Sequence, residues 1–154
     1  MAGQIKGMTI EIGGNTAPLE QALKDTNKEI KSTQKDLKEV EKLLKLDPKN
    51  TELLAEKQKL LAQAVDQTST KLDALKKAKA DADEKMKNGT EVNKEEYRKL
   101  QKEIILTESS LKGYNEQLDA SNEKIDLLGK NATTMNKAMQ VAGAGVLALR
   151  SRTC

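Results

Sequence analysis

Leucine, isoleucine, valine and tyrosine recur at alternating intervals of three and four residues through three long stretches of this chain. This seven-residue repeat is typical of helices that pack along one narrow apolar edge, as in coiled coils. Large apolar side chains are otherwise scarce, because the 154 residues include no Trp, no Phe and two Tyr. Since aromatic side chains supply much of the volume of a globular core, we predict an all-α fold of elongated, antiparallel coiled-coil helices.

The first of three long helices is predicted from near Pro18 to Leu46. We call its apolar edge the seam. The seam residues are Leu19, Leu23, Thr26, Ile30, Thr33, Leu37, Val40 and Leu44. The two threonines weaken this seam, so the helix needs a partner. A turn is expected over residues 47–50, where either Asp47 or Asn50 caps the next helix.

The second helix is predicted from about Thr51 to Lys87, where Asn88 and Gly89 end it because Gly can adopt the left-handed conformation of a helix stop. The third helix is predicted to begin at Asn93 and to stop at Gly129. Asn93 and Glu96 are spaced as a capping box. The second helix has two seam rows, Leu54, Leu61, Thr68, Leu75 and Ala82 in one and Gln58, Val65, Leu72, Lys79 and Met86 in the other. These two helices are near-equal in length, and a short linker folds them into an antiparallel hairpin. The first helix either joins this hairpin or pairs with another copy.

One short β-strand is predicted ahead of the helices. Met8, Ile10 and Ile12 alternate with polar residues, which is the period of a strand. A lone strand leaves backbone groups unpaired, so these three residues either pair with another chain or stay disordered until a partner binds. We therefore divide the chain into a strand segment over 1–15, a coiled-coil region over 16–130, and a Gly/Ala-rich tail over 131–154 that ends as if truncated.

The composition excludes most catalytic and metal chemistry. There is no His, and the single Cys is Cys154. No His-dependent triad, imidazole ligand or thiolate zinc site can therefore be built. We predict no enzyme activity, no cofactor and no metal. The longest weakly apolar run, residues 138–149, is shorter than the ~20 residues of a spanning helix, so no membrane span is predicted.

A row of seven lysines lies opposite the seam of the first predicted helix. This lysine stripe consists of Lys24, Lys28, Lys31, Lys35, Lys38, Lys42 and Lys45. Seven ammonium groups on one face can bind an anionic surface. The row also fits the solvated exterior of a coiled coil, partly neutralised by pairs such as Glu20 with Lys24. It contains no Arg and no aromatic residue, so sequence-specific recognition of nucleic acid is not expected.

Residues 1 to about 60 resemble the amino-terminal region of tail tape measure proteins of long-tailed bacteriophages and prophages of Gram-positive bacteria. The most specific matches are the strand that ends in two glycines, residues 10–14, and the run 40–54 through Leu46, Asp47 and Pro48. The order of strand, double glycine, lysine-rich helix and Asp-Pro turn distinguishes the match from an ordinary coiled coil. The resemblance continues more loosely through the third helix and fades after about Lys130.

The resemblance implies a structural function. Such proteins are mostly helical, lie extended inside the tail tube and set the length at which the tube stops growing. The implied partners are tail assembly chaperones and then the tail tube protein, which the lysine stripe would face. The implied locations are the virion tail and, during assembly, the host cytoplasm. Family members are much longer, so the implied role is that of an amino-terminal part.

The residues alone also fit another class of protein. A self-contained coiled-coil adaptor or spacer that binds a cellular partner would show the same heptads. In either class, the heptad seams allow a homo-oligomer.

Overall fold

The computed structural model describes the backbone of residues 19–150 and the side chains of residues 19–130. Within this range the chain forms four helices and no strand: α1 (Leu19–Ala22), α2 (Lys24–Leu46), α3 (Thr51–Lys87) and α4 (Lys94–Arg150). The all-α prediction is confirmed. The predicted strand, with Met8, Ile10 and Ile12, lies outside the described residues.

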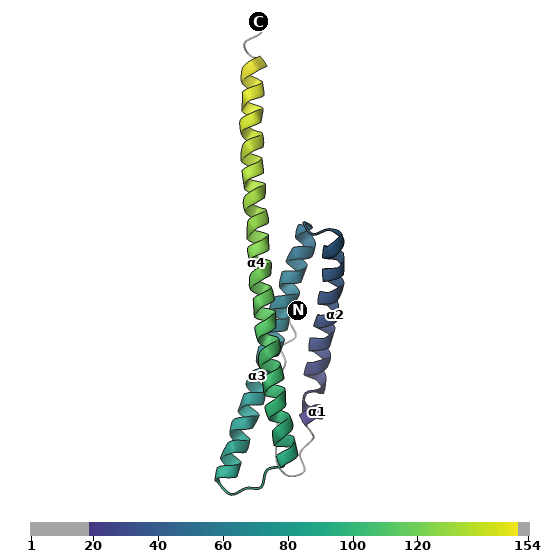
Figure 1. The fold of residues 1–154 in the computed structure, drawn as a ribbon, viewed down its shortest axis with the longest axis vertical. Helices are drawn as coiled ribbons and strands as arrows, with labels where there is room; N and C mark the ends of the chain where they lie inside the picture. The colour runs from purple at the N-terminus through teal and green to yellow at the C-terminus, as the bar shows by residue number, and fades with distance from the viewer. Residues whose placement is uncertain (1–18, 151–154) are drawn as a thin grey trace.

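The three long helices, α2, α3 and α4, lie side by side as a rod-shaped bundle (Figure 1). The backbone of α3 packs against both α2 and α4, whereas α2 and α4 have no Cα atoms within 8 Å of each other. Neighbouring helices run antiparallel because the connections between them are short. The first predicted helix therefore joins the hairpin and does not leave it.

Both connections carry the turn residues that the sequence predicts. At the start of α3, the Asn50 side chain accepts a hydrogen bond of 3.1 Å from the Leu53 N–H. At the end of α3, Gly89 has a φ of +77°, a left-handed conformation that is strained for residues with a Cβ. At the start of α4, Asn93 Oδ1 accepts from the N–H groups of Glu95 and Glu96 at 3.0 and 3.2 Å.

The seam of the first predicted helix is confirmed. Of its eight positions, Ile30 and Leu44 are half-buried and the other six are buried. The helix itself is interrupted at Leu23, which separates α1 from α2. A polar pair supports the seam where it is weakest: Thr33 Oγ1 donates to Gln67 Oε1 on α3 at 3.0 Å.

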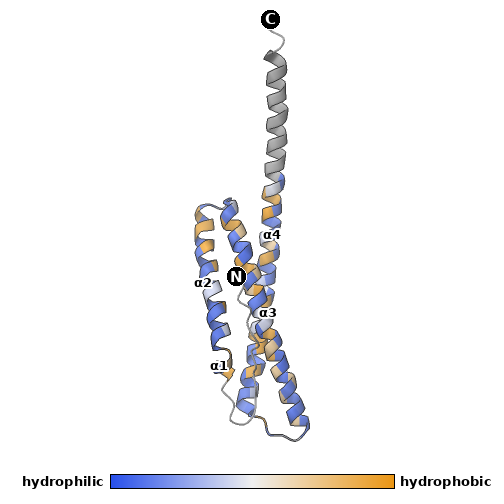
Figure 2. Cartoon of the chain, turned by 180° about the vertical axis from the view of Figure 1, so that it is seen from behind, coloured by the Kyte–Doolittle hydropathy of each residue, from blue (hydrophilic) through white to orange (hydrophobic). Residues whose placement is uncertain are grey.

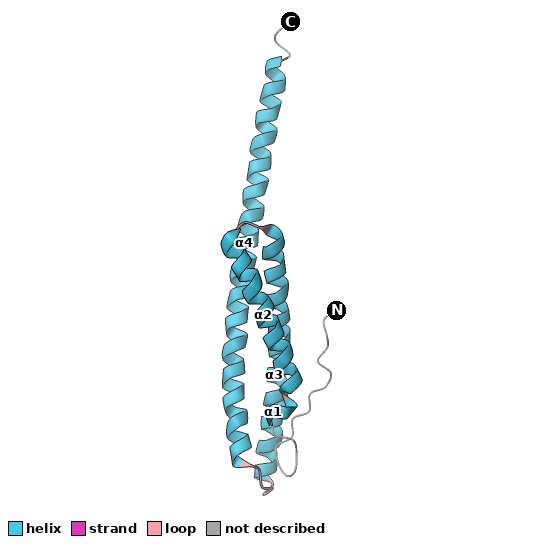
Figure 3. Cartoon of the chain, turned by 90° about the vertical axis from the view of Figure 1, so that its right-hand side faces the viewer, coloured by secondary structure: helices cyan, strands magenta, loops and turns pink. Residues whose placement is uncertain are grey.

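The predicted helix stop at Gly129 is wrong, because α4 continues to Arg150. A mid-helix Gly costs only about 1 kcal/mol relative to Ala. No proline follows, so the chain lacks a second stop signal. The 57 residues of α4 span roughly 85 Å against roughly 55 Å for the 37 residues of α3. The helices are therefore unequal, and α4 projects past the turn between α2 and α3 (Figure 3).

The core is split into two apolar clusters along the rod. One cluster, near the α1 end, centres on Leu23, Leu75 and Leu100, and the other centres on Leu61 and Tyr114. Between them lies a layer of buried polar side chains, namely Thr26, Thr33, Gln67, Thr68, Lys71 and Thr107. Figure 2 shows apolar and polar residues interspersed along the described parts of the helices.

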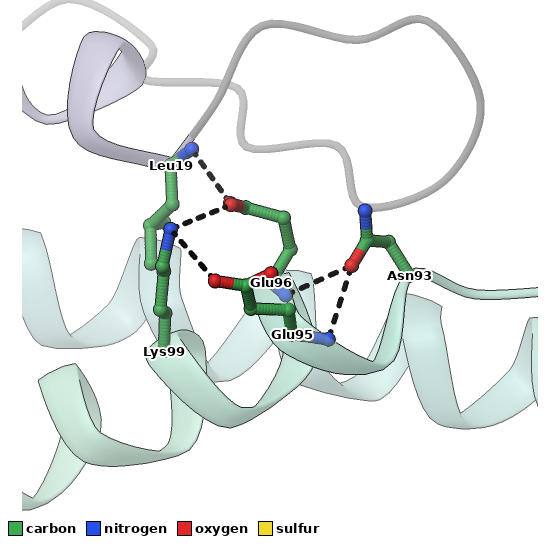
Figure 4. Close-up of polar contacts among 5 residues, drawn as sticks. All are labelled: Leu19, Asn93, Glu95, Glu96 and Lys99. Carbon is green, nitrogen blue, oxygen red and sulfur yellow. Dashed lines mark hydrogen bonds and ion pairs between the residues drawn. The ribbon is translucent and has the colours of Figure 1, made fainter.

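A carboxylate on α4 caps the start of α1 (Figure 4). The Leu19 N–H donates to Glu96 Oε2 at 3.1 Å, and Lys99 Nζ lies 3.2 Å from Glu96 Oε1. The capping-box spacing predicts that Glu96 binds its own helix start at Asn93, but the carboxylate instead satisfies an orphan N–H of another helix. The hydrogen bond from Leu19 is the main cause that holds the pKa of Glu96 below its ordinary value.

We predict that Glu96→Ala destabilises the protein by about 1 kcal/mol at pH 7, the usual effect of losing a helix cap. Because folding lowers the pKa of Glu96, its stabilisation is present above the unfolded pKa and is lost as the pH falls through the folded pKa. Urea unfolding of wild type and variant near neutral pH and near pH 2 measures this. The difference should shrink at acid pH. An equal loss at both pH values, or an equal loss in the exposed neighbour Glu95→Ala, would contradict the cap.

Candidate interaction surfaces

The lysine stripe is exposed along the whole length of α2. All seven of its lysines are exposed. Among residues 19–130, no carboxylate lies within ion-pair distance of any of them, so the expected pair of Glu20 with Lys24 is not formed. The ion pairs between helices use other lysines: Lys57 binds Glu41 at 3.0 Å, and Lys76 binds Glu108 at 2.9 Å. The structure thus leaves the stripe's ammonium groups available to a partner.

The stripe consists of two rows on neighbouring faces of α2. Lys28, Lys35 and Lys42 lie in the row farther from α4. The other row borders a groove between α2 and α4, and two of its members, Lys31 and Lys45, line hollows in that groove. The seven lysines therefore do not form one flat surface.

The groove exists because α2 and α4 each pack against α3 and not against each other. Its floor is α3, and a hydrogen bond of 2.6 Å from Gln34 Nε2 to Tyr114 OH crosses it. On one side of this bridge is a hollow of about 380 Å³. On the other side, toward the turn between α2 and α3, is a second hollow of about 440 Å³.

Three residues that line these hollows carry buried hydroxyl groups that find no hydrogen-bond partner in the part of the chain that the structure describes. Thr68 and Thr107 line the first hollow and Ser121 lines the second, while the hydroxyl oxygen of each is enclosed by protein atoms. These residues are only 2%, 3% and 6% exposed. A buried hydroxyl with no partner raises the free energy of the folded state. The three hydroxyls therefore destabilise the isolated chain along this groove.

We predict that Thr107→Val stabilises the chain by about 1 kcal/mol, because it removes an unpartnered buried hydroxyl. Thermal unfolding followed by circular dichroism at low protein concentration measures the change. The matched control is Thr33→Val, which removes a hydroxyl that donates to Gln67 and should therefore destabilise. The same sign of change in both variants would contradict the difference between the two hydroxyls.

A partly buried ion pair lies in the first hollow. Lys71 Nζ on α3 lies 2.5 Å from Glu103 Oε1 on α4, with side chains 10% and 28% exposed. The sequence pattern does not single out either residue. The burial of Lys71 could have been predicted from its neighbours along α3. Ala64 and Ala78 lie seven residues before and after it, and two such small residues in one row indicate another packing face.

A second polar cluster joins α3 to α4 near their connection. Asp83 accepts hydrogen bonds from Lys79 Nζ at 2.8 Å and Tyr97 OH at 2.5 Å. The hydrogen bond from Lys79 is the main cause that lowers the pKa of Asp83. Both oxygens of this carboxylate are occupied, so the cluster serves as a structural clamp.

Neither a group of side chains suited to hold a metal ion nor a helix able to cross a membrane is found in the part of the chain that the structure describes. No protein family model, curated protein or solved structure matches this chain.

Proposed function

We propose that this chain is a structural phage tail protein, the amino-terminal part of a tape measure that sets the length of the tail tube during assembly. Two features support the proposal. Residues 1 to about 60 resemble that family, and the described helices form a rod with one helix projecting beyond the bundle (Figure 1). In this function the chain acts in the host cytoplasm during assembly and then in the virion tail.

The observation that carries the proposal is the exposed lysine stripe without ion pairs. Surface lysines in coiled coils commonly pair with Glu or Asp of their own helix. Here acidic neighbours such as Glu29 and Asp36 are present on α2, yet the stripe forms no such pair among the described residues. We infer that the stripe binds an acidic surface, first on the assembly chaperones and later on the tail tube protein.

The experiment is to replace all seven stripe lysines by Gln and to measure binding to the proposed partners, a phage tail tube protein and its assembly chaperones. We expect binding to fall by more than about tenfold, since each exposed charge pair contributes up to about 1 kcal/mol. Binding should also weaken with added salt.

A matched control removes the same charge elsewhere. Its seven substitutions to Gln are at exposed lysines without a described ion pair: Lys49, Lys59, Lys77, Lys87, Lys94, Lys102 and Lys124. We expect this variant to bind almost as wild type. Unchanged binding in the stripe variant, or an equal loss in both variants, would refute the role of the stripe.

The second candidate is a coiled-coil adaptor or spacer that binds a cellular partner. One observation favours it: the seam residues of 19–130 pack against each other within one chain, so the bundle needs no second protein to cover them. An adaptor of this kind would have no effect on tail length.

A further inference from the structure

We propose that the groove between α2 and α4 is an interface with a second copy of this chain, in which the α4 of each copy lies parallel in the groove of the other. The hollows, the unpartnered hydroxyls, the apolar residues at the rim and the charges on both sides all point to a helix of this sequence. The inference does not depend on the tail function.

The first argument is the character of the α4 face that borders the groove. This face carries Leu106, Gly113, Ala120 and Leu127, spaced by seven. Leu106 and Leu127 are 62% and 60% exposed, so both apolar side chains are free to contact a second helix. Leu106 and Ala120 also line the two hollows.

The second argument is that no packing contact among residues 19–130 explains the glycine at position 113. A Cβ placed on Gly113 would meet no described atom within 4 Å, and the backbone there is helical. Glycine in a helix costs about 1 kcal/mol relative to Ala, so internal packing does not require it. A second α4 could pack closely against this face, because a residue without a side chain allows two helix axes to approach each other.

The third argument is the position of the three unpartnered hydroxyls. Thr68, Thr107 and Ser121 lie in the hollows that a helix seated in the groove would cover. A helix seated in the groove would therefore lie against the residues whose hydroxyl groups find no partner among the described residues.

The fourth argument is charge complementarity at matching levels of the rod. The bridge between Gln34 and Tyr114 fixes which residues of α2 and α4 lie side by side. In a parallel pair related by a two-fold axis along the rod, Lys38 and Lys45 of one copy lie within two residues, about 3 Å along the axis, of the levels of Glu116 and Glu123 of the other.

These four side chains are exposed in the single chain. The pairing uses two lysines of the row beside the groove and leaves the other row, Lys28, Lys35 and Lys42, on the outside. Both α4 helices then leave the pair at the same end.

The test is sedimentation equilibrium of the full chain over a concentration series, in reducing buffer so that Cys154 forms no disulfide. We expect a monomer–dimer equilibrium in the wild type. Leu106→Glu places a charge on the rim, and Gly113→Leu fills the space that a second α4 needs, so each should weaken the dimer by at least about tenfold.

The matched control is Ile105→Glu. Ile105 is 65% exposed and adjacent in sequence to Leu106, but it lines neither hollow of the groove. It should leave the dissociation constant within about twofold of wild type. Circular dichroism confirms that each variant keeps its helices. A monomer at all concentrations, a dimer insensitive to both groove variants, or an equal effect of Ile105→Glu would each overturn the proposal.

Discussion

Leu61→Ala is expected to lower the free energy of unfolding by about 3 kcal/mol, within the range measured for buried Leu-to-Ala changes. Leu61 is 0% exposed and belongs to the cluster formed with Leu37, Ala64 and Tyr114. It thus lies where all three long helices meet. A thin rod has few other apolar contacts to compensate, and most domains of this size are stable by only about 5–15 kcal/mol.

Urea unfolding followed by circular dichroism measures this change. The matched control is Leu46→Ala at the end of α2, because Leu46 is 84% exposed. We expect its effect to stay below about 0.5 kcal/mol. If both variants unfold at the same urea concentration as wild type, Leu61 does not hold the three helices together.

The second large effect is expected at the ion pair in the groove. Glu103→Ala leaves the ammonium group of Lys71 without its partner, 2.5 Å from where the carboxylate was. Breaking a fully buried pair in this way costs about 3–5 kcal/mol. Because the Glu103 side chain is 28% exposed and water screens the pair, we expect a loss of about 2 kcal/mol.

The double variant Lys71→Met and Glu103→Leu separates two explanations of that loss. If the cost comes from an unpaired charge, replacing both partners by apolar side chains should restore most of the stability. If the double variant is as unstable as the sum of the single changes, the pair is not coupled and the explanation is wrong.

The sequence predicted the helices because they depend on local signals. Asn50, Gly89 and Asn93 act at their own positions in the chain, and each does in the structure what the pattern indicates. The end of α4 was mispredicted because Gly129 resembles a stop signal. Gly129 has no left-handed φ, and the residues after it continue the helix.

The groove was beyond sequence reasoning because it depends on how three helices share their faces. The heptad pattern gives α3 two seam rows, but α3 contacts two partner helices and therefore also buries a third row, Ala64, Lys71 and Ala78. Lys71 is buried in that row, whereas Met86, which the pattern places in a seam, is 43% exposed. Which polar residues are buried becomes clear only from the way in which α2, α3 and α4 pack together.

The lysine stripe was predicted residue by residue, and its exposure is observed. Which partner binds it depends on molecules outside this chain, and neither the pattern nor the fold contains that information.

The most direct test of the tape measure proposal is the length of phage tails, measured by electron microscopy, in a strain from which this coding sequence has been deleted and in the same strain with it restored. The account predicts that the deletion abolishes tails or makes their lengths variable, and that restoration returns one uniform length. Tails of unchanged, uniform length without this chain would contradict the proposal and favour the adaptor.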